Sequence, residues 1–373
     1  MKVALLTMVF NNNYGGMLQA FALQFYLKKK GYDVTLINAQ QKLPPVIKAP
    51  LTIVKRLVQR YVLRKNLEFI VPDWVCRRKV RRREFHTRAF INEYISPRTQ
   101  EVFSNKGIEK VASGFDCYVV GSDQVWRPTM YPYIDSAFFG FLNNRDVKRF
   151  SYAASFGVDK WEYTEKQTEV FRKQISNFAG VSVREVSGVQ LCKDFFQVKA
   201  EHVLDPTMLL SEGEYRSIIP EDLLENVKPE VFCYILDYTN EKTESAKLIA
   251  RKLGLTTSHF FNEKESPNFV YPSVQSWLAS FCNAKFVFTD SFHGCLFSII
   301  FRKPFIVFGN ATRGLDRFKS VLQMVSLEDR MVLSYQELRS LEIDRNLDWD
   351  KVLARLTPKI EFSKSFLMNA MRR

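Results

Sequence analysis

The segment Asp290-Ser291-Phe292-His293-Gly294 carries the clearest chemical potential in this sequence. It lies between an expected strand at 286–289 and an expected helix at 296–301, and the amino end of a helix attracts anions. His293 can donate a hydrogen bond to a phosphate or exchange protons near neutral pH, although isolated histidines are often structural. Ser291 can cap the helix or bind the same anion, and Gly294 permits close approach of the backbone. The segment therefore predicts an anion site.

Two arginines offer positive charge for such an anion. Arg184 follows the apolar run 181–183, and its guanidinium can clamp a carboxylate or a phosphate through two hydrogen bonds. The same position also suits a surface ion pair. Arg313 follows a later expected strand, with Arg317 close behind it, and both can bind the anion or cap and solubilise a helix.

Two carboxylates follow expected strands in the first half of the chain. Asp123 comes after the strand at 117–120 and Asp205 after the strand at 202–204. Ligands of open parallel sheets bind outside the carboxyl ends of the strands, so either side chain can orient a hydroxyl group or exchange a proton. Alternatively, Asp123 caps a helix and Asp205 forms part of a plain turn before Pro206.

The elements that must position these residues alternate between strands and helices. A strand at 3–7, a helix ending at Gly31 and a strand at 34–37 form a βαβ unit, which predicts a parallel sheet. A second such series starts near Val231, after Pro220 and Pro229. We therefore predict an α/β protein with two Rossmann-like domains, GT-B-like in architecture, separated by an interdomain cleft. The expected parts are residues 1–212, residues 213–345, and a helix at 346–373 that returns to the first domain.

The positive charge is concentrated in one insertion. The chain has 54 basic and 40 acidic residues, and residues 51–83 alone hold 11 basic residues against Glu68 and Asp73. Apolar residues recur at helical spacing there, which predicts a basic amphipathic helix followed by a basic run at 77–83. Such a helix suits an anionic membrane surface, or it packs its apolar stripe on a domain. Nucleic acid is disfavoured, because interleaved aromatic residues and a known binding module are missing.

The remaining composition excludes several classes of protein. A hydrophobic content of 46% argues against disorder, and no apolar stretch reaches the roughly 18 residues needed to cross a bilayer. Because Met1 to Thr7 leads directly into a strand, we expect a cytoplasmic protein, either free or peripheral at the inner face of the membrane. The six cysteines lack paired spacing and are expected to be reduced core residues. No metal cluster is visible, so no obligatory metal or cofactor is expected.

Several ordered segments resemble the polysaccharide pyruvyl transferase family, and together they extend over most of the chain. They are Asn13-Tyr14-Gly15-Gly16-Met17-Leu18-Gln19-Ala20, Val120-Gly121-Ser122-Asp123-Gln124-Val125-Trp126, Ser151-Tyr152-Ala153-Ala154-Ser155-Phe156-Gly157, Val183-Arg184-Glu185, Leu204-Asp205-Pro206-Thr207 and Thr289-Asp290-Ser291-Phe292-His293-Gly294. The resemblance implies transfer of a pyruvyl group from phosphoenolpyruvate to a sugar, as a ketal, with release of phosphate. It also implies that Arg184 and His293 bind the donor.

On this basis we expect His293 to handle the phosphate or a proton and Arg184 to hold the donor carboxylate. Asp123 or Asp205 would orient the acceptor hydroxyl. For acceptor contacts we predict Tyr14, Gln19, Ser122 and Trp126. The acceptor is a sugar of a polysaccharide or its precursor, which can be lipid-linked. Two alternatives stay open: a GT-B-type glycosyltransferase that uses a nucleotide sugar, and a non-catalytic sugar-binding or membrane-associated assembly protein.

Overall fold

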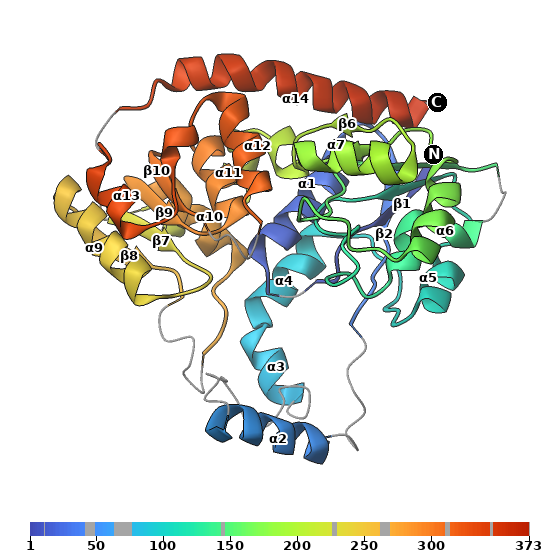
Figure 1. The fold of residues 1–373 in the computed structure, drawn as a ribbon, viewed down its shortest axis with the longest axis horizontal. Helices are drawn as coiled ribbons and strands as arrows, with labels where there is room; N and C mark the ends of the chain where they lie inside the picture. Colours follow the sequence, from blue (N-terminus) through green and yellow to red (C-terminus); the bar gives the residue numbers. More distant parts are fainter. Residues whose placement is uncertain are drawn as a thin grey trace.

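The computed structural model describes residues 1–10, 12–41, 49–62, 77–142, 146–225, 230–261, 269–309, 314–343 and 346–372. Its strands form parallel sheets in two halves of the chain, which lie side by side (Figure 1). We call the elements up to residue 225 the N-terminal half and those from 230 to 343 the C-terminal half.

The N-terminal half is built on a four-stranded parallel sheet. Its order is β2-β1-β3-β4, with β1 at Lys2–Leu6, β2 at Asp33–Leu36, β3 at Cys117–Val120 and β4 at Lys148–Ser151. A parallel pair, β5 (Ser182–Val183) and β6 (Glu201–His202), continues beyond β4 through isolated bridges such as Ala154 to Val183. The carboxyl ends of β3, β5 and β6 therefore lie at one edge.

The C-terminal half contains a five-stranded parallel sheet of order β11-β10-β9-β7-β8. Its strands are β7 (Glu230–Tyr234), β8 (Thr256–His259), β9 (Phe286–Thr289), β10 (Phe305–Phe308) and β11 (Met331–Val332). β9 and β10 are buried at every residue, which fits strands that are covered on both faces by helices. The expected α/β architecture with two Rossmann-like domains is confirmed.

The helices cover both sheets and connect their strands. They are α1 (Tyr14–Lys29), α2 (Ala49–Leu57), α3 (Arg77–Arg83), α4 (Phe85–Tyr94), α5 (Asn105–Val111), α6 (Glu165–Ile175), α7 (Val186–Leu191), α8 (Glu212–Arg216), α9 (Asn240–Leu253), α10 (Val274–Asn283), α11 (Phe292–Ile300), α12 (Asp316–Val325), α13 (Tyr335–Ser340) and α14 (Trp349–Arg372). Within the described ranges, no helix combines the length and apolar content that a bilayer-spanning segment needs.

The two halves are in direct contact. The Tyr14 hydroxyl at the start of α1 donates to the carbonyl of Pro272 at 2.7 Å, and its ring stacks on Trp277 with 6.0 Å between the centroids. One hydrophobic core contains buried side chains from both halves. Helix α14 crosses the top of both halves (Figure 1), and Ser363 on this helix accepts a hydrogen bond from the backbone N–H of Leu204.

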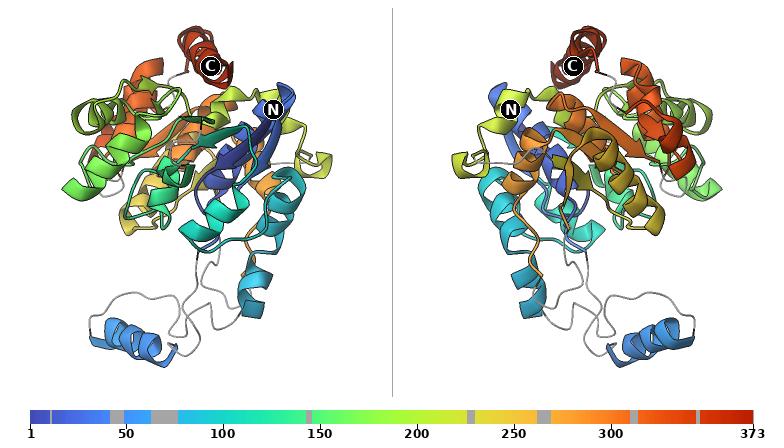
Figure 2. Two further views of the ribbon diagram at one scale, coloured as in Figure 1. Left: turned by 90° about the vertical axis from the view of Figure 1, so that its right-hand side faces the viewer. Right: turned by 90° about the vertical axis from the view of Figure 1, so that its left-hand side faces the viewer.

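The predicted basic helix is present but stands away from the body of the molecule, as Figure 2 shows for α2. A π-helical turn at Val58–Val62 continues it. Its apolar side chains are exposed, with 75% of Leu51 and 70% of Val62 accessible. The interpretation in which this stripe packs on a domain is therefore wrong. Part of the 51–83 insertion, residues 63–76, lies outside the described residues.

Candidate active site

Three charged residues of the N-terminal half meet where its parallel strands end. Arg184 follows β5, Asp205 follows β6 and Asp123 lies beyond β3. One terminal nitrogen of Arg184 lies 2.7 Å from Asp205 Oδ2, and the other lies 3.1 Å from Asp123 Oδ1. All three residues are at most 5% exposed. The alternative of a surface ion pair for Arg184 is thus wrong, since the pairs it forms are buried.

His293 reaches this cluster from the C-terminal half. It lies in the first turn of α11, directly after β9, and its Nε2 is 3.7 Å from Asp205 Oδ2. A Cβ atom on Gly15 would lie 2.0 Å from His293 Nδ1, so the missing side chain of Gly15 makes room for the imidazole. Arg184 and His293, 109 positions apart in the sequence, therefore converge on the same carboxylate.

A second arginine, Arg317 from the C-terminal half, contacts the cluster through an aromatic ring. The guanidinium carbons of Arg184 and Arg317 lie 4.7 and 5.4 Å from the centre of the Phe292 ring, distances that suit cation–π contacts. Burial, and after it the charge of Arg184, lowers the pKa of Arg317 to about 10. Arg317 is 9% exposed, so it contributes positive charge to the junction rather than to the surface.

The mutual electrostatics keep the central groups ionised. Burial alone raises the pKa of both aspartates. Arg184, followed by His293 and Arg317, outweighs this effect at Asp123, and His293 with Arg184 outweighs it at Asp205. The pKa of each aspartate therefore lies below its ordinary value. Burial alone also lowers the pKa of Arg184, whereas Asp123 and Asp205 raise it above the ordinary value. The cluster is a network of charges held by one another.

Polar atoms in the cluster are left without hydrogen bonds. Among the described residues, Arg184 Nε, Glu185 Oε2 and His293 Nε2 are buried and have no hydrogen-bond partner. Each such atom costs free energy unless something satisfies it. The arrangement therefore has unused capacity for a polar ligand at the contact between the halves.

Glu185 is a member of this site that the sequence reasoning did not single out. Its Oε1 accepts hydrogen bonds from the backbone N–H groups of Phe156 and Gly157, at 2.7 and 3.2 Å, and from the Ser155 hydroxyl at 3.0 Å. Burial raises its pKa above the ordinary value. The only signal in the sequence was its place next to Arg184 in the Val183-Arg184-Glu185 segment.

The two candidate carboxylates have different surroundings. Both oxygens of Asp205 are engaged: Oδ1 accepts from the N–H and hydroxyl of Thr207, and Oδ2 accepts from Arg184. Asp123 accepts from Arg184 through Oδ1 only, and it also lines a small cavity together with Phe10 and Asn13. Asp123 therefore borders a cavity, whereas Asp205, with both oxygens engaged, acts as the anchor of the cluster.

The four residues predicted to contact the acceptor are all fully buried. The hydroxyl of Tyr14 is held by Pro272, as described above. Gln19 accepts from the N–H of Ser122 at 3.0 Å and donates to Thr7 at 2.7 Å. Trp126 stacks on Phe138 and donates to the carbonyl of Ala137. In this structure these side chains build the scaffold under the turn that presents Asp123.

The other residues predicted to bind the donor, Ser291, Gly294 and Arg313, differ in what the structure shows of them. Ser291 caps α11, because its hydroxyl accepts from the N–H of Gly294 at 3.3 Å. A Cβ atom on Gly294 would lie 2.3 Å from the hydroxyl of Thr289, so this glycine is needed for packing of the helix on its strand. Arg313 lies outside the described residues.

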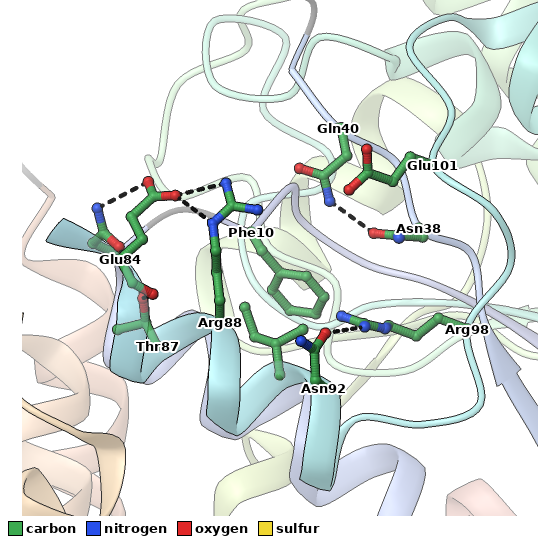
Figure 3. Close-up of a pocket in the computed structure, with 11 residues that line it drawn as sticks. Phe10, Asn38, Gln40, Glu84, Thr87, Arg88, Asn92, Arg98 and Glu101 are labelled. Atoms are coloured by element: carbon green, nitrogen blue, oxygen red, sulfur yellow. Dashed lines mark hydrogen bonds and ion pairs between the residues drawn. The ribbon is translucent and has the colours of Figure 1, made fainter. Parts of the chain in front are cut away.

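A polar pocket lies at the carboxyl ends of β1 and β2 (Figure 3). It has a cavity volume of about 110 Å³ and an open mouth. Its lining comes from the loops after these strands, from the start and first turns of α4, and from the segment after α4: Phe10, Asn12, Asn38, Gln40, Glu84, Thr87, Arg88, Ile91, Asn92, Arg98 and Glu101. The sequence reasoning missed it, although the polar run after the strand at 34–37 was a usable signal.

In the described parts of the chain, no group of three or more His, Cys, Asp or Glu side chains is placed to hold a metal ion. Cys117, Cys192, Cys233, Cys282 and Cys295 are free and buried, and burial raises the pKa of the Cys117 thiol to about 12. Cys76 lies outside the described residues. Buried thiols with raised pKa values are inert core residues rather than nucleophiles.

The fold is shared with known structures at low sequence identity. UDP-N-acetylglucosamine 2-epimerase from Rickettsia bellii aligns over 100% of this chain and 96% of its own, with 10% identity and a TM-score of 0.55. The UDP-GlcNAc 2-epimerase of Methanocaldococcus jannaschii aligns over 96% and 93%, with 10% identity and a TM-score of 0.49. The likeness to the Rickettsia bellii structure shows the fold alone, which is of the GT-B type. A comparison with curated protein sequences gives no significant match.

A family model supplies the assignment that fold similarity cannot. The model described as "Polysaccharide pyruvyl transferase" matches residues 13–312, a range that contains Asp123, Arg184, Asp205 and His293. The matched range starts at the helix that accommodates His293 and extends past α11, the helix that carries it. This chain belongs to the polysaccharide pyruvyl transferase family.

Proposed function

We propose that this protein transfers the pyruvyl group of phosphoenolpyruvate to a sugar and releases phosphate. Family membership supports a transferase of this general kind. The observation that carries the donor assignment is the meeting of Arg184 and His293, each with a buried nitrogen that lacks a hydrogen-bond partner. Phosphoenolpyruvate bears a carboxylate and a phosphate on a small carbon frame, and such an anion needs preorganised donors of this type.

The chemistry requires three proton movements. A sugar hydroxyl adds to C2 of phosphoenolpyruvate as it loses its proton, and the C3 methylene gains a proton to become a methyl group. The bond between C2 and the phosphate oxygen then breaks, and phosphate leaves with the electron pair. A second sugar hydroxyl adds to C2 and loses its proton, which closes the ketal.

We assign the roles from the surroundings of each side chain. His293 exchanges the proton or binds the phosphate, and Arg184 holds the donor carboxylate. Arg317 adds a second positive charge close by. Asp123 orients the acceptor hydroxyl, because it has an oxygen that is not bonded to Arg184 and lines a cavity. Asp205, with both oxygens engaged, positions Arg184 and His293.

The site must open to admit the donor. Arg184 is 3% and His293 5% exposed, so the observed arrangement is closed. The contacts that close it join the two halves: Tyr14 to Pro272, Gly15 against His293, and Phe292 against Arg184. We therefore propose that separation of the halves admits phosphoenolpyruvate and that closure excludes water from the reacting groups.

We test the proposal by following free phosphate in mixtures of the protein, phosphoenolpyruvate and candidate nucleotide-linked or lipid-linked sugars. Phosphate release is expected only when donor and acceptor are both present. His293→Ala should lower the rate about 100-fold or more while circular dichroism shows that the fold is retained. Near-normal turnover of this variant would remove His293 from the mechanism. Stabilisation by a nucleoside diphosphate, and not by phosphoenolpyruvate, would favour a glycosyltransferase instead.

We also propose that α2 and the turn after it bind an anionic membrane surface. Its apolar residues are exposed, with 59% of Val54 and 67% of Tyr61 accessible, and the basic side chains of Lys55 and Arg60 are exposed among them. Apolar groups that enter the lipid boundary and cations that attract anionic headgroups act together in such helices. This location would bring the enzyme to an acceptor built on a lipid carrier.

A further inference from the structure

The pocket in Figure 3 lies on the same sheet edge as the reaction centre, but it belongs to the N-terminal half alone. Phe10 follows β1, whereas Asn38 and Gln40 follow β2. The loop from β2 is fixed by backbone hydrogen bonds, from Val102 to the carbonyl of Asn38 at 3.0 Å and from Gln40 to the carbonyl of Val102 at 2.8 Å. The pocket is therefore preformed rather than dependent on closure of the halves.

The polar side chains of this pocket have hydrogen-bond donors and acceptors that are not paired with one another. Gln40 donates to the Asn38 side-chain carbonyl at 2.7 Å, which leaves the Gln40 carbonyl and the Asn38 amino group. Arg98 makes one side-chain hydrogen bond, to Asn92 at 2.6 Å. The exposed Glu101 carboxylate stands close to Gln40 and Asn38 in Figure 3. The pocket thus offers both donors and acceptors, as hydroxyl groups require.

The charge of the lining selects against an anion. The carboxylates of Glu84 and Glu101 balance the guanidinium groups of Arg88 and Arg98, and the Glu84–Arg88 pair is closed at 2.7 Å. A phosphate or a carboxylate would meet two negative side chains with no surplus of positive charge. The lining therefore suits a neutral, hydroxyl-rich ligand and differs from the donor cluster, which contains two buried arginines.

Phe10 connects this pocket to the reaction centre. Its side chain lines the pocket and also lines the small cavity that contains Asp123. The half-buried phenyl ring offers an apolar face to the C–H groups of a sugar ring. A ligand held against Phe10 in the polar pocket would thus lie next to the cavity that Asp123 lines.

We propose that this pocket binds a neutral sugar unit of the acceptor, with Glu101, Arg98 and Gln40 on its hydroxyl groups and Phe10 beneath its ring. The inference rests on the proposed function, because it takes the acceptor to be a sugar. It goes further in that it locates the acceptor away from Tyr14, Gln19, Ser122 and Trp126. The unit bound here would present a hydroxyl group past Phe10 to Asp123.

Binding is tested without turnover by ligand-observed saturation-transfer NMR. The probes are methyl β-galactopyranoside, methyl β-glucopyranoside, methyl β-mannopyranoside and the methyl glycoside of N-acetylglucosamine, with glucose 6-phosphate as a charged comparison. Wild-type protein is expected to bind at least one neutral glycoside. Glu101→Gln and Arg98→Ala should each weaken that binding about tenfold, which is the loss of one hydrogen bond to a charged group. Glu244→Gln, an exposed change on α9, is the matched control and should have no effect.

Several outcomes would overturn the inference. The first is the lack of a saturation-transfer signal for every neutral glycoside. The others are unchanged glycoside binding in both pocket variants, and tighter binding of glucose 6-phosphate than of the neutral glycosides. Phosphoenolpyruvate is titrated separately by thermal shift, and the pocket variants should keep wild-type stabilisation by it. If glycosides bind in the pocket and phosphoenolpyruvate does not bind, the donor assignment fails. If phosphoenolpyruvate binds and the glycosides do not depend on the pocket, the acceptor assignment fails.

Discussion

Individual residues at the junction are constrained by contacts that come from both halves. Gly15 is the clearest case, because the imidazole of His293 occupies the space that any larger side chain would fill. The neighbouring Gly16 has a different reason for its small size, since a Cβ atom there would lie 3.3 Å from the Asn13 amide. Adjacent glycines of one helix turn therefore have unequal tolerance for substitution.

Gly15→Ala is expected to displace His293 and to lower phosphoenolpyruvate-dependent phosphate release by at least about tenfold, since a misplaced catalytic group loses much of its effect. Gly16→Ala is the matched control, and it should retain most of the activity because the Asn13 side chain can give way by a few tenths of an ångström. Steady-state rates of the two variants, with circular dichroism to check folding, provide the comparison. Equal rates for both would show that the position of His293 does not limit the reaction.

Asp205→Asn is expected to destabilise the protein by about 3–5 kcal/mol at pH 7, because it leaves the buried Arg184 without its shortest ion pair. The folded-state pKa of Asp205 is lowered, so its contribution to stability is complete above the unfolded pKa of about 3.9. This contribution decreases progressively as the pH falls from the unfolded value toward the folded value. Unfolding temperatures measured between pH 7 and pH 3 should therefore show the difference between variant and wild type shrinking toward low pH.

The exposed Asp222 provides the control for that series. Asp222→Asn should leave the unfolding temperature within experimental error at every pH, since exposed charges contribute little. A gap between Asp205→Asn and wild type that stays constant down to pH 3 would mean that the Asp205 charge does not stabilise the fold.

At the scale of elements, the carboxyl ends of parallel strands bring the site together. β3, β5 and β6 deliver Asp123, Arg184 and Asp205, and β9 delivers His293 from the other sheet. In contrast, α2 takes no part in this packing, and its apolar side chains remain in solvent. A basic helix without a packing partner in the described structure has the features of a surface-binding element.

The membrane proposal is tested by cosedimentation with two kinds of vesicle. One contains phosphatidylcholine alone, and the other also contains about 30% phosphatidylglycerol, which mimics an anionic leaflet. Wild-type protein is expected to bind only the anionic vesicles, less so at high salt. The triple variant Lys55→Glu, Arg60→Glu, Arg82→Glu should lose this binding. The control triple Lys166→Glu, Lys173→Glu, Lys199→Glu makes the same charge change at exposed positions elsewhere and should retain most of it. Equal loss in both triples would show that only overall charge matters.

At the scale of the whole molecule, closure of the halves controls access to the buried site. Beside the contacts around Tyr14 and His293, the backbone N–H of Val186 on α7 donates to the hydroxyl of Ser320 on α12 at 3.3 Å. This contact joins the exposed Val186 to the buried Ser320, and neither residue belongs to the charged cluster. A covalent link here would therefore hold the closed arrangement without replacing a residue of the cluster.

The double variant Val186→Cys, Ser320→Cys is expected to lose activity on oxidation and to regain it on reduction, because the donor cannot enter while the halves are linked. Phosphate release before and after reduction gives the readout, and mass spectrometry reports the disulfide. Each single-cysteine variant should stay active under both conditions. A cross-linked protein with full activity would show that the donor reaches Arg184 and His293 without separation of the halves.

The sequence by itself determined the α/β class, the family resemblance and the identity of the central residues. Strand and helix patterns are local, since they depend on hydrophobic period and on glycine and proline signals, and residues at strand ends such as Arg184, Asp205 and His293 follow from them. The basic, amphipathic character of residues 51–62 is likewise a local property.

Only the tertiary structure decided which of these side chains meet and which are already engaged. That Arg184 is bonded to both aspartates, that Gly15 makes room for His293, and that Tyr14, Gln19, Ser122 and Trp126 are buried depends on contacts between segments distant in the chain. The pocket around Phe10 and Glu101 is of the same kind, because its walls come from separate loops. Local patterns carry no information about such distances, which are set by how the two sheets and their helices pack.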